Sequence, residues 1–108
     1  MNPFVWIGTL ATAALLTCMP ATAKTVLIDV RTSAEYAQDH IEGALNIDHS
    51  VIGRTIVSAN VAKDDSILLY CRSGNRSGAA METLKALGYS RVENYGGISE
   101  ARKRLQKY

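Results

Sequence analysis

Residues 66–87 read SILLYCRSGNRSGAAMETLKAL and carry three successive structural signals. The apolar run from Ser66 to Cys71 predicts a central strand that is covered on both faces. The residues that follow include a glycine and an asparagine, which tolerate unusual backbone angles and favour a loop. From Ser77 to Leu87 the apolar side chains fall on one helical stripe, and Gly88 is suited to end the helix. We therefore predict a strand, a loop and a helix.

The same alternation of strand and helix extends to both sides of this segment. Further strands are predicted at Thr25–Val30, Ala44–Ile47 and Arg91–Asn94. Further helices are predicted from Thr32 or Ser33, from Ser50 to about Asn60, and from Ser99, with a turn at Gly96-Gly97. Strands that alternate with helices indicate an α/β fold, with a small parallel sheet flanked by helices on both faces.

The charge distribution divides the 108 residues into a leader and a domain. No charged side chain precedes Lys24. The uncharged run Phe4–Cys18 is shorter than the roughly 20 apolar residues of a membrane-spanning helix. Small residues in Ala21-Thr22-Ala23 suit a signal peptidase. We expect residues 1–23 to be a signal peptide, cleaved after Ala23, and residues 24–108 to form a periplasmic domain.

The leader departs from the usual pattern because it lacks a positively charged start. Two alternatives therefore stay open: a buried helix of the domain itself, and a lipid anchor on Cys18. If the leader is removed, Cys71 is the only cysteine left in an oxidising compartment. It is then either a small buried apolar residue or a reactive thiol.

Composition also limits the partners. The net charge is +2, and no block of like charge is long enough to form an interaction tail. The basic residues near the C-terminus are explained by the negative end of the terminal helix. We expect no nucleic-acid partner, membrane contact only through an uncleaved leader, and a monomeric domain.

The chemistry is expected at Cys71, at the carboxyl end of a parallel strand, where open α/β sheets place their sites. Loop amides and the start of the following helix favour an anion there. Arg72 and Arg76 add positive charge, and together these effects favour the nucleophilic thiolate over the thiol.

The segment CRSGNR, followed by Ser77, resembles the active loop of the rhodanese family of sulfurtransferases. Other segments that resemble family signatures are Ile28–Arg31, Tyr36, His40-Ile41, Gly43-Ala44, Asn46-Ile47 and Gly96–Ile98. The likeness is strongest to short, exported, single-domain bacterial members. The chain lacks the strand that many members carry before the first signature, which implies a sheet of about four strands. It also has Asp39 and Glu42 where Gly and Pro are frequent, and no Trp follows Gly97.

The resemblance implies a two-step reaction without cofactor or metal. Cys71 takes the outer sulfur of a donor such as thiosulfate, and the resulting persulfide passes it to cyanide, a small thiol or a protein thiol. Substrate-binding residues are expected in the loop, at Arg72, Ser73, Gly74, Asn75, Arg76 and Ser77. Within this set, Arg76 is expected to point back over the pocket, and Arg72 to lie at its rim.

Two other functions remain open. A cysteine phosphatase or arsenate reductase has five residues between its cysteine and arginine, whereas four separate Cys71 from Arg76. This shorter loop is sized for a sulfur atom. A persulfide carrier or sulfur-binding module would use the same loop. His40 and His49 are expected to be structural, because the transfer needs no histidine proton and their spacing is not that of metal ligands.

Overall fold

The computed structural model describes residues 23–106. The strands are β1 (Thr25–Asp29), β2 (Leu45–Asn46), β3 (Ser66–Cys71) and β4 (Arg91–Gly97). The helices are α2 (Ser33–Gln38), α3 (Ile52–Thr55), the 3-10 helix η1 (Ile56–Ala59), α4 (Asn75–Ala86) and α5 (Ile98–Leu105). All strand pairs are parallel, in the order β2-β1-β3-β4. The predicted α/β fold with a four-stranded parallel sheet is confirmed.

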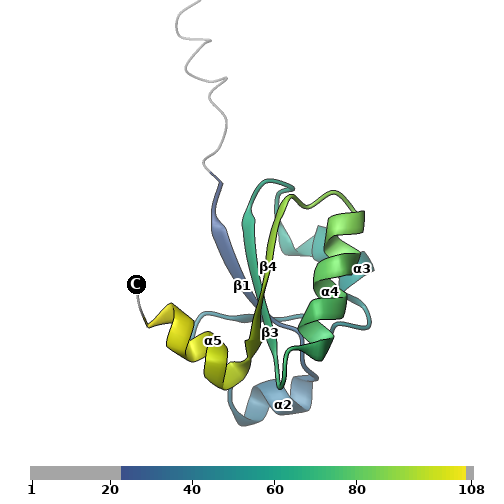
Figure 1. The fold of residues 1–108 in the computed structure, drawn as a ribbon. Coiled ribbons are helices and arrows are strands. Elements are labelled where there is room, and N and C mark those ends of the chain that lie inside the picture. The colour runs from purple at the N-terminus through teal and green to yellow at the C-terminus, as the bar shows by residue number, and fades with distance from the viewer. Residues whose placement is uncertain (1–22, 107–108) are drawn as a thin grey trace, which may run out of the picture.

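Apolar side chains cover both faces of the sheet. In β3, Ile67 and Leu69 face a core shared with α3, η1 and α4, whereas Leu68 and Tyr70 face a core shared with α5. Figure 1 shows α3 and α4 on one side of the strands and α5 on the other. A strand that alternates between two cores must be apolar throughout, which explains the continuous run SILLYC.

The carboxyl ends of the strands meet at one edge of the sheet. The β3–α4 loop lies there, and α2 lies beside it (Figure 1). The short helix α2 is fixed by a capping box, in which Thr32 and Glu35 each bind the other's backbone amide. The capping box therefore places Glu35 at the edge that carries the loop.

Four predicted boundaries were wrong. The second strand is only Leu45–Asn46 and not Ala44–Ile47, because the Ala44 amide closes a turn by donating to the Ile41 carbonyl. The helix predicted from Ser50 is split between α3 and η1, and α4 begins two residues before Ser77. The last strand continues through Gly96-Gly97, where a turn was predicted, because Gly97 pairs with Cys71.

The predicted signal peptide lies almost entirely outside the described residues. Within residues 23–106, no helix is both long and apolar enough to cross a bilayer. The described chain begins beside Lys24, whose backbone amide and Nζ both donate to the buried carboxylate of Asp65, at 3.0 and 2.8 Å. These hydrogen bonds link the residue before β1 to Asp65, the residue before β3.

Candidate functional site

Cys71 is the last residue of β3, and its side chain is fully buried. The Gly74 amide donates to its Sγ at 2.9 Å. Gly74 has a φ of +99°, a conformation that glycine adopts without strain. This residue caps α4, so the loop turns tightly enough to bring its own amides back to the sulfur.

Two opposing effects act on the pKa of Cys71. Burial raises it, because a charged thiolate is poorly solvated in the protein interior. Hydrogen bonds from the Ser77 hydroxyl and from the backbone amides of Ser77, Ser73 and Gly74 lower it. The hydrogen bonds prevail, and the pKa of Cys71 is lower than that of an ordinary thiol. The site therefore favours an anionic sulfur, which is the nucleophilic form.

Ser77 does not cap the helix. It lies in the first turn of α4, fully buried, with its Oγ 3.4 Å from the Cys71 sulfur and 2.6 Å from Oδ1 of Asn94. The Asn94 amide nitrogen donates to the Gly74 carbonyl at 3.1 Å, and its oxygen accepts from the Gly96 amide at 2.9 Å. Asn94 thus joins β4 to the cysteine loop. The role of Asn94 was not predicted from the sequence, because a single asparagine in a short strand gives no signal of its own.

The two glycines at the end of β4 make room for the loop. A Cβ on Gly97 would collide with the carbonyl of Arg72. A Cβ on Gly74 would lie 3.4 Å from the Gly96 Cα. Backbone therefore packs on backbone here, which gives the Gly96-Gly97 pair a physical role.

The two loop arginines lie in different environments. Arg72 is exposed, as are Ser73 and Asn75. Arg76 is half-buried, and its guanidinium binds the Glu35 carboxylate at 2.8 and 3.1 Å. A partner for Arg76 was not predicted, because Glu35 is 41 residues away along the chain and no local pattern links the two.

Asp29 and Arg31 form a buried ion pair at the end of β1. Arg31 donates to both carboxylate oxygens of Asp29, at distances from 2.7 to 3.1 Å, and its backbone amide adds a further bond. It also reaches the Asp39 carbonyl. Because these groups bind each other and the backbone, the pair fixes the carboxyl end of the sheet next to β3.

The two histidines make local contacts. The His40 ring stacks on the Tyr36 ring at 3.7 Å between centroids, and its Nδ1 lies 2.8 Å from the Tyr36 carbonyl. Nδ1 of His49 is 3.2 Å from the neighbouring Asp48 carboxylate. Neither histidine has a hydrogen bond to the sulfur of Cys71 in the described part of the chain.

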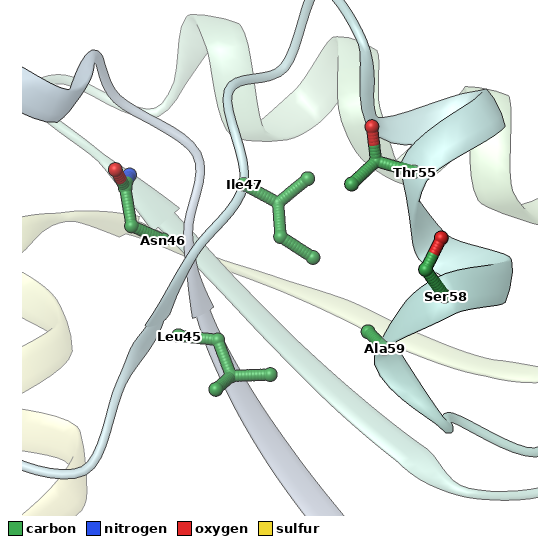
Figure 2. A pocket seen from close by; sticks show the side chains of 6 residues that line it. All are labelled: Leu45, Asn46, Ile47, Thr55, Ser58 and Ala59. Carbon is green, nitrogen blue, oxygen red and sulfur yellow. The ribbon is translucent and has the colours of Figure 1, made fainter.

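A separate cavity of about 270 Å³ opens between β2 and the α3–η1 segment (Figure 2). Its lining comprises Leu45, Asn46, Ile47, Thr55, Ser58 and Ala59. The only polar side chains among them are the Asn46 amide and the hydroxyls of Thr55 and Ser58. This lining has no charged side chain that could bind an anionic substrate.

Comparison with known proteins gives consistent matches. The family described as the rhodanese-like domain matches residues 12–103, starting inside the segment predicted as leader. Thiosulfate sulfurtransferase PspE from Escherichia coli is 39% identical over 87 residues, which cover 81% of this chain and 84% of that protein. A sulfurtransferase from Allochromatium vinosum is 42% identical over 78 residues, 71% of each chain. A solved structure of a rhodanese with anions from E. coli superposes with a TM-score of 0.68 at 39% identity, covering 70% of this chain and 89% of that one.

Proposed function

Because this chain belongs to the rhodanese-like domain family and is similar to sulfurtransferases, we propose that it transfers a sulfane sulfur from thiosulfate to a thiophilic acceptor through a persulfide on Cys71. The observation that carries the proposal is the hydrogen bond from the Gly74 amide to the Cys71 sulfur in a loop that lowers the pKa of that thiol. A nucleophilic sulfur is thereby prepared before any donor arrives.

In the first step the Cys71 thiolate attacks the outer sulfur of thiosulfate. A new S–S bond forms, the S–S bond of thiosulfate breaks, and sulfite leaves with the bonding electron pair. In the second step cyanide or a thiolate attacks the terminal sulfur. The Cys71–S bond breaks, and the electron pair returns to Cys71 as thiolate. One difficult transfer is thus divided into two easier displacements.

The loop supplies different groups to the two species. The amides of Ser73, Gly74 and Ser77 already converge on the Cys71 sulfur, and they also suit the negative terminal sulfur of a persulfide. Arg72 and Arg76 supply positive charge for the oxyanions of the donor, with Asn75 beside them at the start of α4. In this scheme the amides and side chains of the loop provide all the contacts to the donor and to the persulfide.

We also propose that the protein acts in the periplasm, as a monomer whose sequence before Lys24 has been removed. The uncharged leader and the small residues before Lys24 support export. Small sulfur compounds are its substrates, and an exported protein thiol would be a suitable acceptor.

Mass spectrometry of the intact protein tests the proposal. After incubation with thiosulfate, the protein should gain the mass of one sulfur atom on Cys71 and lose it when cyanide is added, with release of thiocyanate. Cys71→Ser should fold, because the two side chains have similar size, but it should gain no sulfur. A wild-type protein that never gains sulfur, or a folded serine variant that still forms thiocyanate, would refute the proposal. Phosphatase and arsenate reductase assays on the same sample test the alternative chemistry.

A further inference from the structure

Glu35 and Arg76 form a close two-point ion pair beside the cysteine loop. Two N–H groups of Arg76 face the two carboxylate oxygens of Glu35, and their side chains are 28% and 22% exposed. The Arg76 guanidinium, followed by the Thr32 amide, lowers the pKa of Glu35 to about 2. Glu35 is therefore a permanent negative charge at neutral pH.

The position of this carboxylate is fixed. Glu35 Oε1 also accepts from the Thr32 amide at 3.0 Å and from the Thr32 hydroxyl at 3.1 Å. The capping box thus holds Glu35 in place whether or not a donor is bound. The hydrogen bonds to Glu35, and to a smaller extent the nearby charge of the Cys71 sulfur, raise the pKa of Arg76. A donor that approaches the sulfur therefore meets an arginine whose charge is already balanced.

The result is a site with less positive charge than its sequence indicates. Of the two loop arginines, Arg72 is exposed, and within residues 23–106 its side chain has no acidic partner. Arg76 is neutralised by Glu35. A dianion near the sulfur is attracted by Arg72 but only weakly by Arg76, because Glu35 balances the charge of Arg76. A donor of lower charge loses less attraction through this pairing.

We propose that Glu35 is a specificity-determining residue, which limits the preference of the Cys71 site for doubly charged sulfur donors and so admits singly charged organic donors. The inference rests on the proposed sulfur transfer, and it names the donor class that this site accepts. Glu35 acts through Arg76 and does not touch the reacting sulfur.

The charge preference of the site can be measured with two donors of similar size that react in the same way but differ in net charge. Thiosulfate carries two negative charges, and methanethiosulfonate carries one, because a methyl group replaces one oxyanion. Both give their outer sulfur to Cys71 in the same way: the new S–S bond forms as the old one breaks. Sulfite leaves from the first and methanesulfinate from the second, each with the bonding electron pair. The ratio of their loading rates therefore reports the charge preference of the site.

Glu35→Gln is the variant to test. The glutamine oxygen can still accept from Thr32, so the cap of α2 is retained while the charge is removed. We expect the ratio of kcat/KM for thiosulfate to that for methanethiosulfonate to rise about three- to tenfold. The reason is that loss of the Glu35 charge leaves the positive charge of Arg76 free to attract the dianion. The rise should shrink in high salt. Asp39→Asn is the matched control, because it removes a carboxylate that pairs with Arg102 on the surface.

A double variant tests the route of the effect. In an Arg76→Ala background the further change Glu35→Gln should no longer raise the ratio, because the arginine that Glu35 pairs with is absent. If circular dichroism shows that Glu35→Gln is unfolded, Glu35→Ala gives the same readout, because the exposed Thr32 amide can bind water instead. An unchanged ratio in a folded Glu35 variant overturns the inference while leaving the sulfur transfer intact. Failure of both donors to load the wild-type protein overturns the proposed function itself.

Discussion

The Ser77 hydroxyl lies 2.6 Å from the side-chain oxygen of Asn94 and 3.4 Å from the sulfur of Cys71. The Gly74 carbonyl lies 3.1 Å from the same hydroxyl, which has one proton to donate, so these three acceptors compete for it. A neutral thiol is a weak acceptor, whereas a thiolate is a strong one. We therefore expect the proton to turn from Asn94 to Cys71 when the sulfur becomes charged. The oxygen of Asn94 is not left unpaired, because the Gly96 amide still donates to it.

Ser77→Ala removes this adaptable donor. Burial of Cys71, which raises the pKa of its thiol, is unchanged in this variant. One of the hydrogen bonds that lower this pKa is lost, so the pKa should rise. The rate of alkylation by iodoacetamide at neutral pH should fall about three- to tenfold, as expected for a weak bond to a charged group. The full pH–rate profile distinguishes this effect from structural damage: its midpoint should move to higher pH while the plateau rate stays the same. A profile that coincides with that of wild type would contradict the assigned role.

Gly97→Ala tests the contact between β4 and the loop. The backbone of Gly97 suits alanine, but the added Cβ would collide with the Arg72 carbonyl. We expect the free energy of unfolding to fall by about 1–3 kcal/mol, the usual effect of overpacking, and sulfur loading to slow. Gly78→Ala is the control, because its Cβ would meet only the Asn94 side chain, at 3.4 Å, and helix α4 gains up to about 1 kcal/mol of helix propensity. Urea unfolding of both variants gives the comparison.

The sequence predicts the sheet and its central loop because both depend on local signals. The run SILLYC, the glycine at position 74 and the helical stripe after it are close together along the chain. Glu35 and Asn94 were missed because their roles depend on which polar side chains the fold brings to one edge. The sequence predicts a helix that begins near Thr32, but it predicts neither the capping box with Glu35 nor the pairing of Glu35 with Arg76. The start of α4 was placed too late for a different reason: Gly74, which has no side chain to bind the helix amides, precedes its first turn.

Asp65 gives a prediction for acid stability. The Lys24 side chain and then the Lys24 and Ala62 amides lower its pKa from 3.8 to about 2. A carboxylate with a lowered pKa stabilises the fold fully above its ordinary pKa, and this contribution is lost as the pH falls through about 2. The Tm of the wild type should therefore drop between about pH 4 and pH 2. Asp65→Asn should have a lower Tm than the wild type at pH 7, and its Tm should fall less between about pH 4 and pH 2. If plots of Tm against pH run parallel for the two proteins, Asp65 is not the group responsible for the loss of stability in acid.

The same contact predicts an effect of cleavage after Ala23. If the mature chain begins at Lys24, the nitrogen 3.0 Å from Asp65 is no longer an amide but a charged α-amino group. A chain that starts at Lys24 should then have a higher Tm than chains that start at Ala23 or Thr25. The advantage should diminish above about pH 8, where an α-amino group loses its proton. Calorimetry of the three chains decides it, and equal Tm values would show that the new terminus gains nothing from Asp65.

Arg72 is the loop cation that no carboxylate neutralises among residues 23–106, so thiosulfate loading should depend on it strongly. Its side chain is exposed at the rim of the loop, while its backbone is held against Gly97. Loss of a charged hydrogen-bond donor costs about 1.5–3 kcal/mol, which corresponds to a roughly ten- to hundredfold slower loading of Cys71 in Arg72→Ala. Discharge of a preformed persulfide to cyanide should be nearly unchanged, because the loop amides and not Arg72 hold the terminal sulfur. Arg91→Ala removes an exposed arginine at the other end of the sheet and serves as the control. Rapid quenching followed by mass spectrometry measures both half-reactions, and loading at the wild-type rate with a failing discharge would assign Arg72 to the persulfide instead of the donor.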